Sequence, residues 1–369
     1  MKNEKNVGGL STLNNKDQST NARGAVSRSN NNGGWIKRHK ESIRRYKSLT
    51  MSVVAAGLIM VTSTSCDKIE NFDELVPQTV EFDGSLSSID VNGTKLHAET
   101  FGNPGDPIIV GIHGGPGADY KSILNLKDFA SEGYFVVLYD QRGSGLSQRH
   151  DADAFTVQVM IDDLKGVINH YQMPGSKIIL AGHSWGAMLA TAYINQYPNE
   201  VDGMILMEPG GLTWEDTKDY LSKVLAINIF SEATSDMLYQ DQFLTVSDHA
   251  ELDYKSAVGG ANAHLGDNVT GLIGPTPFRR FGSVCNGALK NHADEVPFDF
   301  TTNLSQVNIP VLFVYSELNK AYGFEHAQKV SAPFLDVQLF QVIGAGHEMV
   351  LSGWNNLRPT VLTYLNSIN

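Results

Sequence analysis

The sequence predicts an α/β protein with a mostly parallel central sheet, helices on both faces, and an inserted helical segment. Three observations support this prediction. Short apolar runs typical of buried strands alternate with helical stripes. The strand pattern stops over residues 212–300 and then resumes. A serine stands between two glycines where one such strand gives way to a helix. Strands that alternate with helices form parallel sheets, because a parallel crossover needs a dozen or more residues.

The strands are expected in a regular order along the chain. Alternating runs over residues 85–90 and 94–100 flank Asn92 and Gly93, the strongest short hairpin signal. Further strands are predicted at residues 107–112, 134–139, 177–181, 201–207, 310–315 and 337–342.

Helices are expected between and after these strands. A helical stripe runs from Val157 to Tyr171, with Thr156 as its N-cap. Residues 187–193 favour a helix, and an amphipathic helix from Trp354 to Ile368 closes the chain.

The charge of the chain is uneven. It has 369 residues, of which 41% are hydrophobic and 18% charged, and a formal net charge of -12. Residues 1–66 hold 11 Lys and Arg and 3 Asp and Glu, whereas the remaining residues hold 17 and 37. An acidic body repels phosphate backbones, so we expect no nucleic-acid partner. The same charge attracts cationic substrates, or it only keeps the protein soluble.

The two cysteines, Cys66 and Cys285, do not form a disulfide framework, and no Cys or His spacing suggests zinc. The sequence therefore gives no reason to expect a metal or organic cofactor.

The first eighty residues are typical of a targeting segment. Residues 1–48 form a basic leader, expected to be disordered. Residues 49–66 hold an apolar run, too short for the ~20 residues that span a bilayer, then small residues and Cys66. This pattern resembles a bacterial lipoprotein signal, although Ser63 replaces the usual leucine. We expect cleavage before Cys66, lipidation of that cysteine and attachment to a cell-envelope membrane, periplasmic or outer, with residues 67–80 as a tether. Plain secretion and an uncleaved anchor are the alternatives.

Residues 182–186 (GHSWG) carry the expected nucleophile. They lie between a strand and a helix, so G-x-S-x-G here predicts a nucleophile elbow at Ser184. The glycines are needed because a Cβ at either flank would collide with the neighbouring strand or helix. His183 is expected to pack under the elbow.

Two glycine-rich loops supply the other parts that acyl transfer needs. Residues 113–117 (HGGPG) follow the third predicted strand, where Gly115 is expected to donate one N–H to an oxyanion and Trp185 the other. Residues 344–348 (GAGHE) follow the last strand and offer His347 as the base that takes the serine proton.

With these motifs and residues 140–147 (DQRGSGLS), residues 81–369 resemble the α/β-hydrolase superfamily, and within it the prolyl iminopeptidase group. The resemblance implies an α/β-hydrolase fold with core segments at residues 81–211 and 301–369 and a lid at 212–300. In such proteins the 140–147 loop is mainly scaffold, with Asp140 and Arg142 tying loops together below the site.

The third member of the triad departs from the pattern of that group. The usual acid closes the turn after the seventh strand, but Asn319 stands there and cannot carry the charge. Glu208, after the sixth strand, and Glu317, two residues before Asn319, are both candidates.

The resemblance implies a serine aminopeptidase that releases N-terminal residues, such as proline, from small peptides. In such enzymes a lid carboxylate binds the free amino terminus and aromatic side chains hold the ring. Possible counterparts are Trp214, Glu215, Glu232, Asp236, Phe278 and Phe281.

Two other functions remain open. A carboxylesterase or lactonase would use the same triad, and a non-catalytic binding protein would fit the irregular position of the acid. An epoxide hydrolase or haloalkane dehalogenase does not fit, because those enzymes need an aspartate in place of Ser184.

Overall fold

The structure, a computed structural model, describes residues 72–224, 249–263, 268–274 and 278–368. These residues lie in one of two units of the chain, Glu70–Asn369. The predicted leader, the signal with Cys66 and the start of the tether lie outside the described residues. No helix within the described ranges is both long and apolar enough to cross a membrane.

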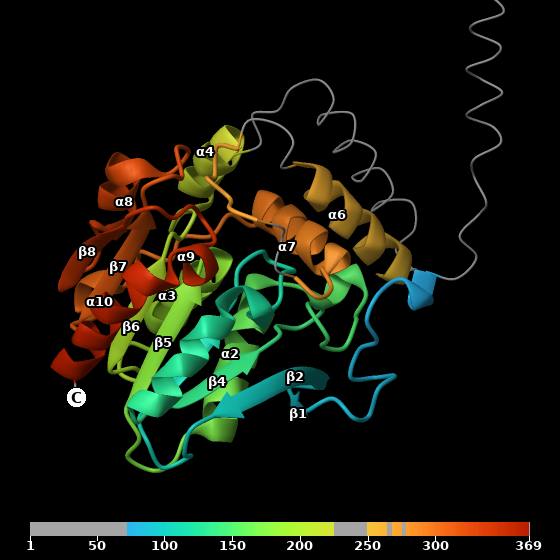
Figure 1. The fold of residues 1–369 in the computed structure, drawn as a ribbon, viewed down its shortest axis with the longest axis horizontal. Helices are drawn as coiled ribbons and strands as arrows, with labels where there is room; N and C mark the ends of the chain where they lie inside the picture. The colour runs from blue at the N-terminus through green and yellow to red at the C-terminus, as the bar shows by residue number, and fades with distance from the viewer. Residues whose placement is uncertain (1–71, 225–248, 264–267, 275–277, 369) are drawn as a thin grey trace, which may run out of the picture. The chain divides into compact units, whose positions relative to one another are not determined.

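The described residues form an eight-stranded sheet in the order β1-β2-β4-β3-β5-β6-β7-β8. The first two pairings, β1 with β2 and β2 with β4, are antiparallel, and all later pairings are parallel. The strands are β1 (Ser88–Val91), β2 (Thr94–Phe101), β3 (Ile108–Ile112), β4 (Phe135–Tyr139), β5 (Ile178–His183), β6 (Gly203–Met207), β7 (Val311–Ser316) and β8 (Val337–Val342). The predicted α/β class and mostly parallel sheet are confirmed (Figure 1).

The central strands form where consecutive residues are suited to burial, so that the side chains on both faces of the sheet are covered. Every residue of β3, β4, β5, β6 and β7 is buried, as expected for parallel strands covered on both faces. At the antiparallel edge, Asn92 and Gly93 both have positive φ, 47° and 75°, in the two-residue turn between β1 and β2. That is the backbone of a type I′ hairpin turn, which explains the Asn-Gly signal.

Helices cover the two faces of the sheet with separate apolar cores. One face carries α2 (Val157–Tyr171), α3 (Trp185–Gln196) and α8 (Gly323–Ser331). The other carries the 3-10 helix η2 (Tyr120–Glu132), α9 (Met349–Ser352) and α10 (Trp354–Ser367). The N-cap of α2 is Thr156, whose side chain accepts from the Val159 N–H, as predicted.

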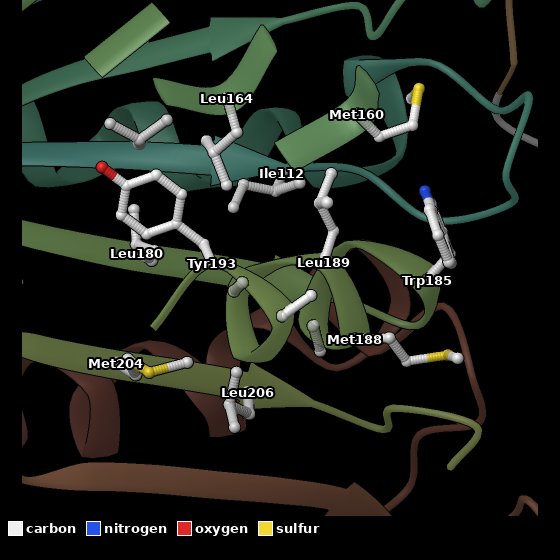
Figure 2. Close-up of a cluster of buried hydrophobic side chains, with 14 of the residues drawn as sticks. Ile112, Met160, Leu164, Leu180, Trp185, Met188, Leu189, Tyr193, Met204 and Leu206 are labelled. Atoms are coloured by element: carbon white, nitrogen blue, oxygen red, sulfur yellow. The ribbon is translucent and has the colours of Figure 1, made fainter. Parts of the chain in front are cut away.

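Helix α3 is buried on nearly all of its sides. The core therefore holds it rigidly in place directly after Ser184. Ten of its twelve residues are buried. Figure 2 shows Leu189 and Tyr193 of α3 packed with Leu180 of β5, Ile112 of β3 and Leu164 of α2. Replacing one such buried leucine with alanine costs about 2–5 kcal/mol in comparable cores, so this packing fixes the start of α3 firmly.

The segment between β6 and β7 is helical in its described part. It contains α4 (Trp214–Val224), α6 (His249–Ala263) and α7 (Ser283–Glu295) (Figure 1). An isolated bridge between Thr213 and Asp299 closes its base, close to the predicted limits 212 and 300. Its role as a lid stays a prediction.

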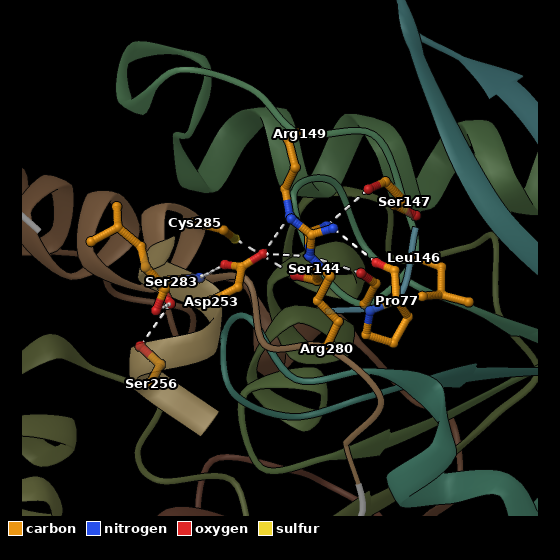
Figure 3. A network of polar contacts seen from close by, with 12 residues as sticks. Pro77, Ser144, Leu146, Ser147, Arg149, Asp253, Ser256, Arg280, Ser283 and Cys285 are labelled. Carbon is orange, nitrogen blue, oxygen red and sulfur yellow. Dashed lines mark hydrogen bonds and ion pairs between the residues drawn. The ribbon is translucent and has the colours of Figure 1, made fainter. Parts of the chain in front are cut away.

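A buried ion-pair cluster fastens α6 to the core (Figure 3). Asp253 of α6 is 1% exposed, and its Oδ2 accepts from Arg149 at 3.0 Å and Arg280 at 2.7 Å. Its Oδ1 accepts from the N–H of Ser283, the first residue of α7. Arg149 also donates to the carbonyl oxygens of Gly145 and Ser147 in the loop after β4. Because a buried charge must keep its partners, this cluster fixes the position of α6 on the core.

Candidate active site

Ser184 lies at a strained turn between β5 and α3. Its backbone has φ 54° and ψ -119°, a region that L side chains rarely adopt. A Cβ on Gly186 would run into the Ile112 carbonyl oxygen, and one on Gly182 into the backbone of Gly186, which explains both glycines. The Ser184 N–H donates to the Met207 carbonyl at 2.8 Å and secures the turn to β6. The structure therefore has the expected elbow.

His347 and Glu208 are in direct contact. His347 lies in the loop after β8, and its Nδ1 is 2.6 Å from Glu208 Oε2. Glu208 follows β6 directly and is fully buried, with a positive φ of 47°. Burial disfavours the imidazolium, but the hydrogen bond and charge of Glu208 outweigh it and raise the pKa of His347.

Four hydrogen bonds hold the Glu208 carboxylate. Oε1 accepts from the N–H and Oγ–H of Ser316, at 2.7 and 2.6 Å. Oε2 accepts from His347 and from the Asn319 side chain, the latter at 2.9 Å. Burial opposes ionisation, yet His347, Ser316 and Asn319 together hold the pKa of Glu208 below its ordinary value. The carboxylate is thus ionised and fixed at neutral pH.

The structure does not bring the other candidate acid, Glu317, to His347. Glu317 is exposed, and its Oε2 accepts from the Gly344 N–H at 2.8 Å. Asn319, at the position where the prolyl iminopeptidase pattern has its acid, points to Glu208 instead. Glu208 therefore provides the carboxylate next to His347, and Asn319 supports it.

His183 supports the loop after β8 that carries His347, here called the histidine loop. It is 2% exposed, and its Nε2 donates to the His347 carbonyl at 2.8 Å. Burial, aided by the charge of His347, lowers the pKa of His183 to about 3, so this ring is neutral and can serve as that donor. The sequence indicated a packing role, and the structure adds this hydrogen bond.

Gly115 and Trp185, the two residues expected to donate N–H groups to an oxyanion, line the same cavity as Ser184. Trp185 is the first residue of α3, where a helix leaves its N–H without an acceptor inside the helix. Gly115 has φ 115° in the loop after β3 and lines the same cavity as Ser184 and Trp185. Their role as donors to an oxyanion stays a prediction.

Gln141 links the loop after β3 to Trp185, the first residue of α3. Its Oε1 accepts from Trp185 Nε1 at 2.9 Å, and its Nε2 donates to the His113 carbonyl at 2.8 Å. Its own N–H donates to His113 Nε2 at 2.9 Å. The sequence indicated only that the 140–147 loop is scaffold, and no pattern in it singled out this residue.

Asp140 and Arg142 make contacts that tie loops together, the role that the resemblance implied. Asp140 accepts from the N–H groups of Tyr120 and Leu146. Arg142 forms a buried bidentate ion pair with Asp163, in which the two N–O distances are 2.7 and 2.9 Å. Both side chains tie loops to one another.

A cavity of about 300 Å³ opens beside Ser184. Its lining is largely apolar and aromatic, and its polar side chains include Asn286 and Lys290 at one side. The apolar residues include Met188, Trp214, Tyr220, Leu221, Leu289 and Phe298. None of the lining residues in the described part is a carboxylate.

The candidate substrate-binding residues have different outcomes. Trp214 lines the cavity, whereas Glu215 is exposed on α4. The ring centroids of Phe278 and Phe281 lie 6.0 Å apart, and neither residue lines the cavity. Glu232 and Asp236 lie outside the described residues.

No group of three or more His, Cys, Asp or Glu side chains in the described ranges could hold a metal ion. Cys285 is buried, and burial raises the pKa of its thiol to about 12, so it is a poor nucleophile.

Comparisons with known proteins agree with this geometry. Residues 107–353 match the family described as alpha/beta hydrolase fold. The chain is 24% identical to proline iminopeptidase PfmaB of Pestalotiopsis fici over 281 residues, 71% of this chain and 92% of that protein. It is 30% identical to a proline iminopeptidase of Heyndrickxia coagulans over 254 residues, 63% and 82% of the two chains.

Solved structures of the same fold include proteins of other activities. An epoxide hydrolase from Bacillus megaterium superposes with a TM-score of 0.55 at 19% identity, covering 76% of this chain and 100% of that one. At this identity the likeness shows the fold alone. The family match spans more than half of the chain, and we conclude that this protein belongs to the α/β hydrolase fold family and is a hydrolase.

Proposed function

We propose that the protein is a serine hydrolase that works through an acyl-enzyme. Ser184 attacks the substrate carbonyl while His347 takes its proton, and ionised Glu208 stabilises the imidazolium. The N–H groups of Gly115 and Trp185 hold the oxyanion of the tetrahedral intermediate. His347 then returns the proton to the leaving group, and water releases the acyl group. The 2.6 Å contact between His347 and buried Glu208 is the observation that carries this proposal.

Within this mechanism we propose an aminopeptidase that removes the N-terminal residue of small peptides. The two proline iminopeptidases to which the chain is similar support this substrate class. A cavity of about 300 Å³ suits a single small acyl unit such as one residue. The acidic body of the chain favours a substrate with a free ammonium group.

Ester hydrolysis is the second candidate, and the lining of the cavity favours it. Its described lining holds aromatic and aliphatic side chains and lacks a carboxylate to receive an amine. The alternative of a non-catalytic binding protein was supported only by the irregular position of the triad acid. Because Glu208 supplies the carboxylate next to His347, that support is gone.

A panel of chromogenic substrates separates the two activities. We expect the mature domain to cleave prolyl, alanyl or leucyl para-nitroanilide, and Ser184→Ala to abolish this cleavage. Cleavage of para-nitrophenyl acetate and butyrate without any cleavage of the anilides would overturn the aminopeptidase proposal and leave the esterase. Glu317→Gln is the matched control, because Glu317 lies near the site but does not contact His347.

We further propose that Cys66 carries a lipid that holds the enzyme at a cell-envelope membrane. The signal pattern in the sequence is the only support. In a bacterial host that processes lipoproteins, the protein should fractionate with membranes and Cys66→Ser should not. Equal fractionation of both forms would exclude this attachment.

A further inference from the structure

The start of α7, in the inserted segment, is hydrogen-bonded to the loop after β3. The N–H of Gly282, the N-cap of α7, donates to the Gly117 carbonyl oxygen at 2.7 Å. Asn286, in the first turn of α7, donates from Nδ2 to the Pro116 carbonyl oxygen at 2.7 Å. The two residues that accept these bonds directly follow Gly115 in the chain. The inserted segment therefore holds the loop next to the expected oxyanion donor.

The backbones of α7 and of this loop approach each other closely. Gly117 has φ 101°, and a Cβ on it would lie 2.6 Å from the Gly282 carbonyl oxygen. A Cβ on Gly282 would in turn run into the Gly143 carbonyl oxygen, in the loop after β4. The start of α7 thus lies between two loops of the core, and both Gly117 and Gly282 are needed for the fit.

The core also holds the start of α7 in place. Asp253, the centre of the buried ion-pair cluster, accepts from the Ser283 N–H at 3.0 Å. Just before α7, the N–H groups of Arg279 and Arg280 donate to Asp119 Oδ2. A side chain can fix its partner only if its own backbone is fixed, and these contacts meet that condition for α7.

The loop that α7 holds lies against the nucleophile. A Cβ on Gly114 would come within 3.1 Å of Ser184 Cβ. Asn286 lines the same cavity as Gly115 and Ser184. Gln141 donates to the carbonyl of the first residue of this loop, and Asn286 donates beyond Gly115. The loop is thus held on both sides of Gly115.

We propose that Asn286 is a positioning residue that fixes the direction of the Gly115 N–H toward the oxyanion. This inference rests on the proposed acyl-enzyme mechanism, in which Gly115 is a donor. A glycine backbone has wide conformational freedom, so hydrogen bonds to the residues that follow it must restrict the direction of its N–H. A donor lowers the barrier most when it already points to the place where charge develops. Through Asn286, the inserted segment helps to prepare the site for the reaction.

The test replaces Asn286 with Leu, which is close to asparagine in shape but cannot donate, and in a second variant with Ala. Two inhibitors of para-nitrophenyl acetate hydrolysis are compared. Ethyl trifluoromethyl ketone forms a hemiketal, in which Ser184 Oγ adds to the carbonyl carbon and the carbonyl oxygen takes the place of the oxyanion. The corresponding alcohol has no carbonyl and cannot add.

In both variants, kcat/KM for the ester and the affinity for the ketone should fall together by about 10- to 100-fold. The affinity for the alcohol should not change, because it makes no oxyanion. Asn291→Leu is the matched control, since Asn291 is on the same helix but does not line the cavity. It should change neither affinity.

An unchanged affinity for the ketone in a variant that thermal unfolding shows to be folded would overturn the inference. An equal loss of affinity for the ketone and the alcohol would also overturn it, because Asn286 would then only shape the cavity. Failure of the proposed mechanism appears in the unmodified protein instead. That protein would neither hydrolyse the ester nor bind the ketone more tightly than the alcohol.

Discussion

Asn319 and Glu208 show how one residue can take over the role of another within a preserved site. Asn319 stands where the family pattern has an acid, yet its amide donates to the carboxylate of Glu208 at 2.9 Å. Glu208 reaches the same place from the neighbouring strand, since β6 pairs with β7 and the Glu208 N–H bonds to the Val314 carbonyl. The charge that His347 needs is therefore supplied from one strand further inward.

Replacing Glu208 with Gln should reduce kcat by roughly 10³- to 10⁴-fold, because the imidazolium loses its counter-charge. The acid limb of the kcat/KM profile should also move to lower pH. His347 must be neutral to act as a base, and Glu208 raises the pKa of His347. Without the charge of Glu208, burial would lower the pKa of His347. Steady-state kinetics across the acid range would measure both effects.

Glu317→Gln is the control for this experiment and should leave rate and pH profile unchanged. Thermal unfolding of each variant separates loss of catalysis from loss of fold. A Glu208→Gln enzyme that is folded and fully active, or a Glu317→Gln enzyme that is inactive, would reverse the assignment of the acid.

The sequence located Ser184 and His347 but could not choose between the two acids. Both glutamates follow a strand, and spacing along the chain is equally compatible with either. The choice depends on side-chain direction, which the pairing of distant strands decides. Glu317 turns to Gly344, whereas Ser316 and Asn319 converge on Glu208. Gln141 was missed for the same reason, since its significance lies in the contacts that it makes in space.

At the scale of elements, Gln141 joins the loop after β3 to the start of α3. Gln141→Ala removes the hydrogen bonds to Trp185 Nε1 and to the His113 carbonyl. Because catalysis is sensitive to misplacement of about 1 Å, kcat should fall by about 10- to 100-fold while KM changes little. Gln158→Ala, on the exposed surface of α2, is the matched control. Destabilisation of Gln141→Ala without a loss of kcat in its folded fraction would show that Gln141 supports only the fold.

Most elements could be predicted because their patterns are local. The hairpin turn, the apolar strands and the N-cap of α2 depend on neighbouring residues. The sequence did not predict η2, a 3-10 helix that is kinked at Ile123. It also did not predict α8 or the anchoring of α6 through Asp253, whose partner Arg149 is 104 positions away.

At the scale of the whole molecule, the sheet order converts scattered motifs into one site. β5, β6 and β7 are neighbours in the sheet, and β8 lies beside β7. Their carboxyl ends therefore bring Ser184, Glu208 and the histidine loop to one edge, as in other parallel sheets. The predicted fold class followed from the alternation of strands and helices, but the order of the strands did not.

The central claim is that Ser184 is an activated nucleophile, and covalent labelling tests it most directly. The measurement is intact mass, followed by peptide mapping, after treatment with a fluorophosphonate. The account predicts one adduct on Ser184, none on Ser184→Ala, and much slower labelling of Glu208→Gln than of Glu317→Gln. An unlabelled, folded protein, or an adduct on a residue other than Ser184, would contradict it.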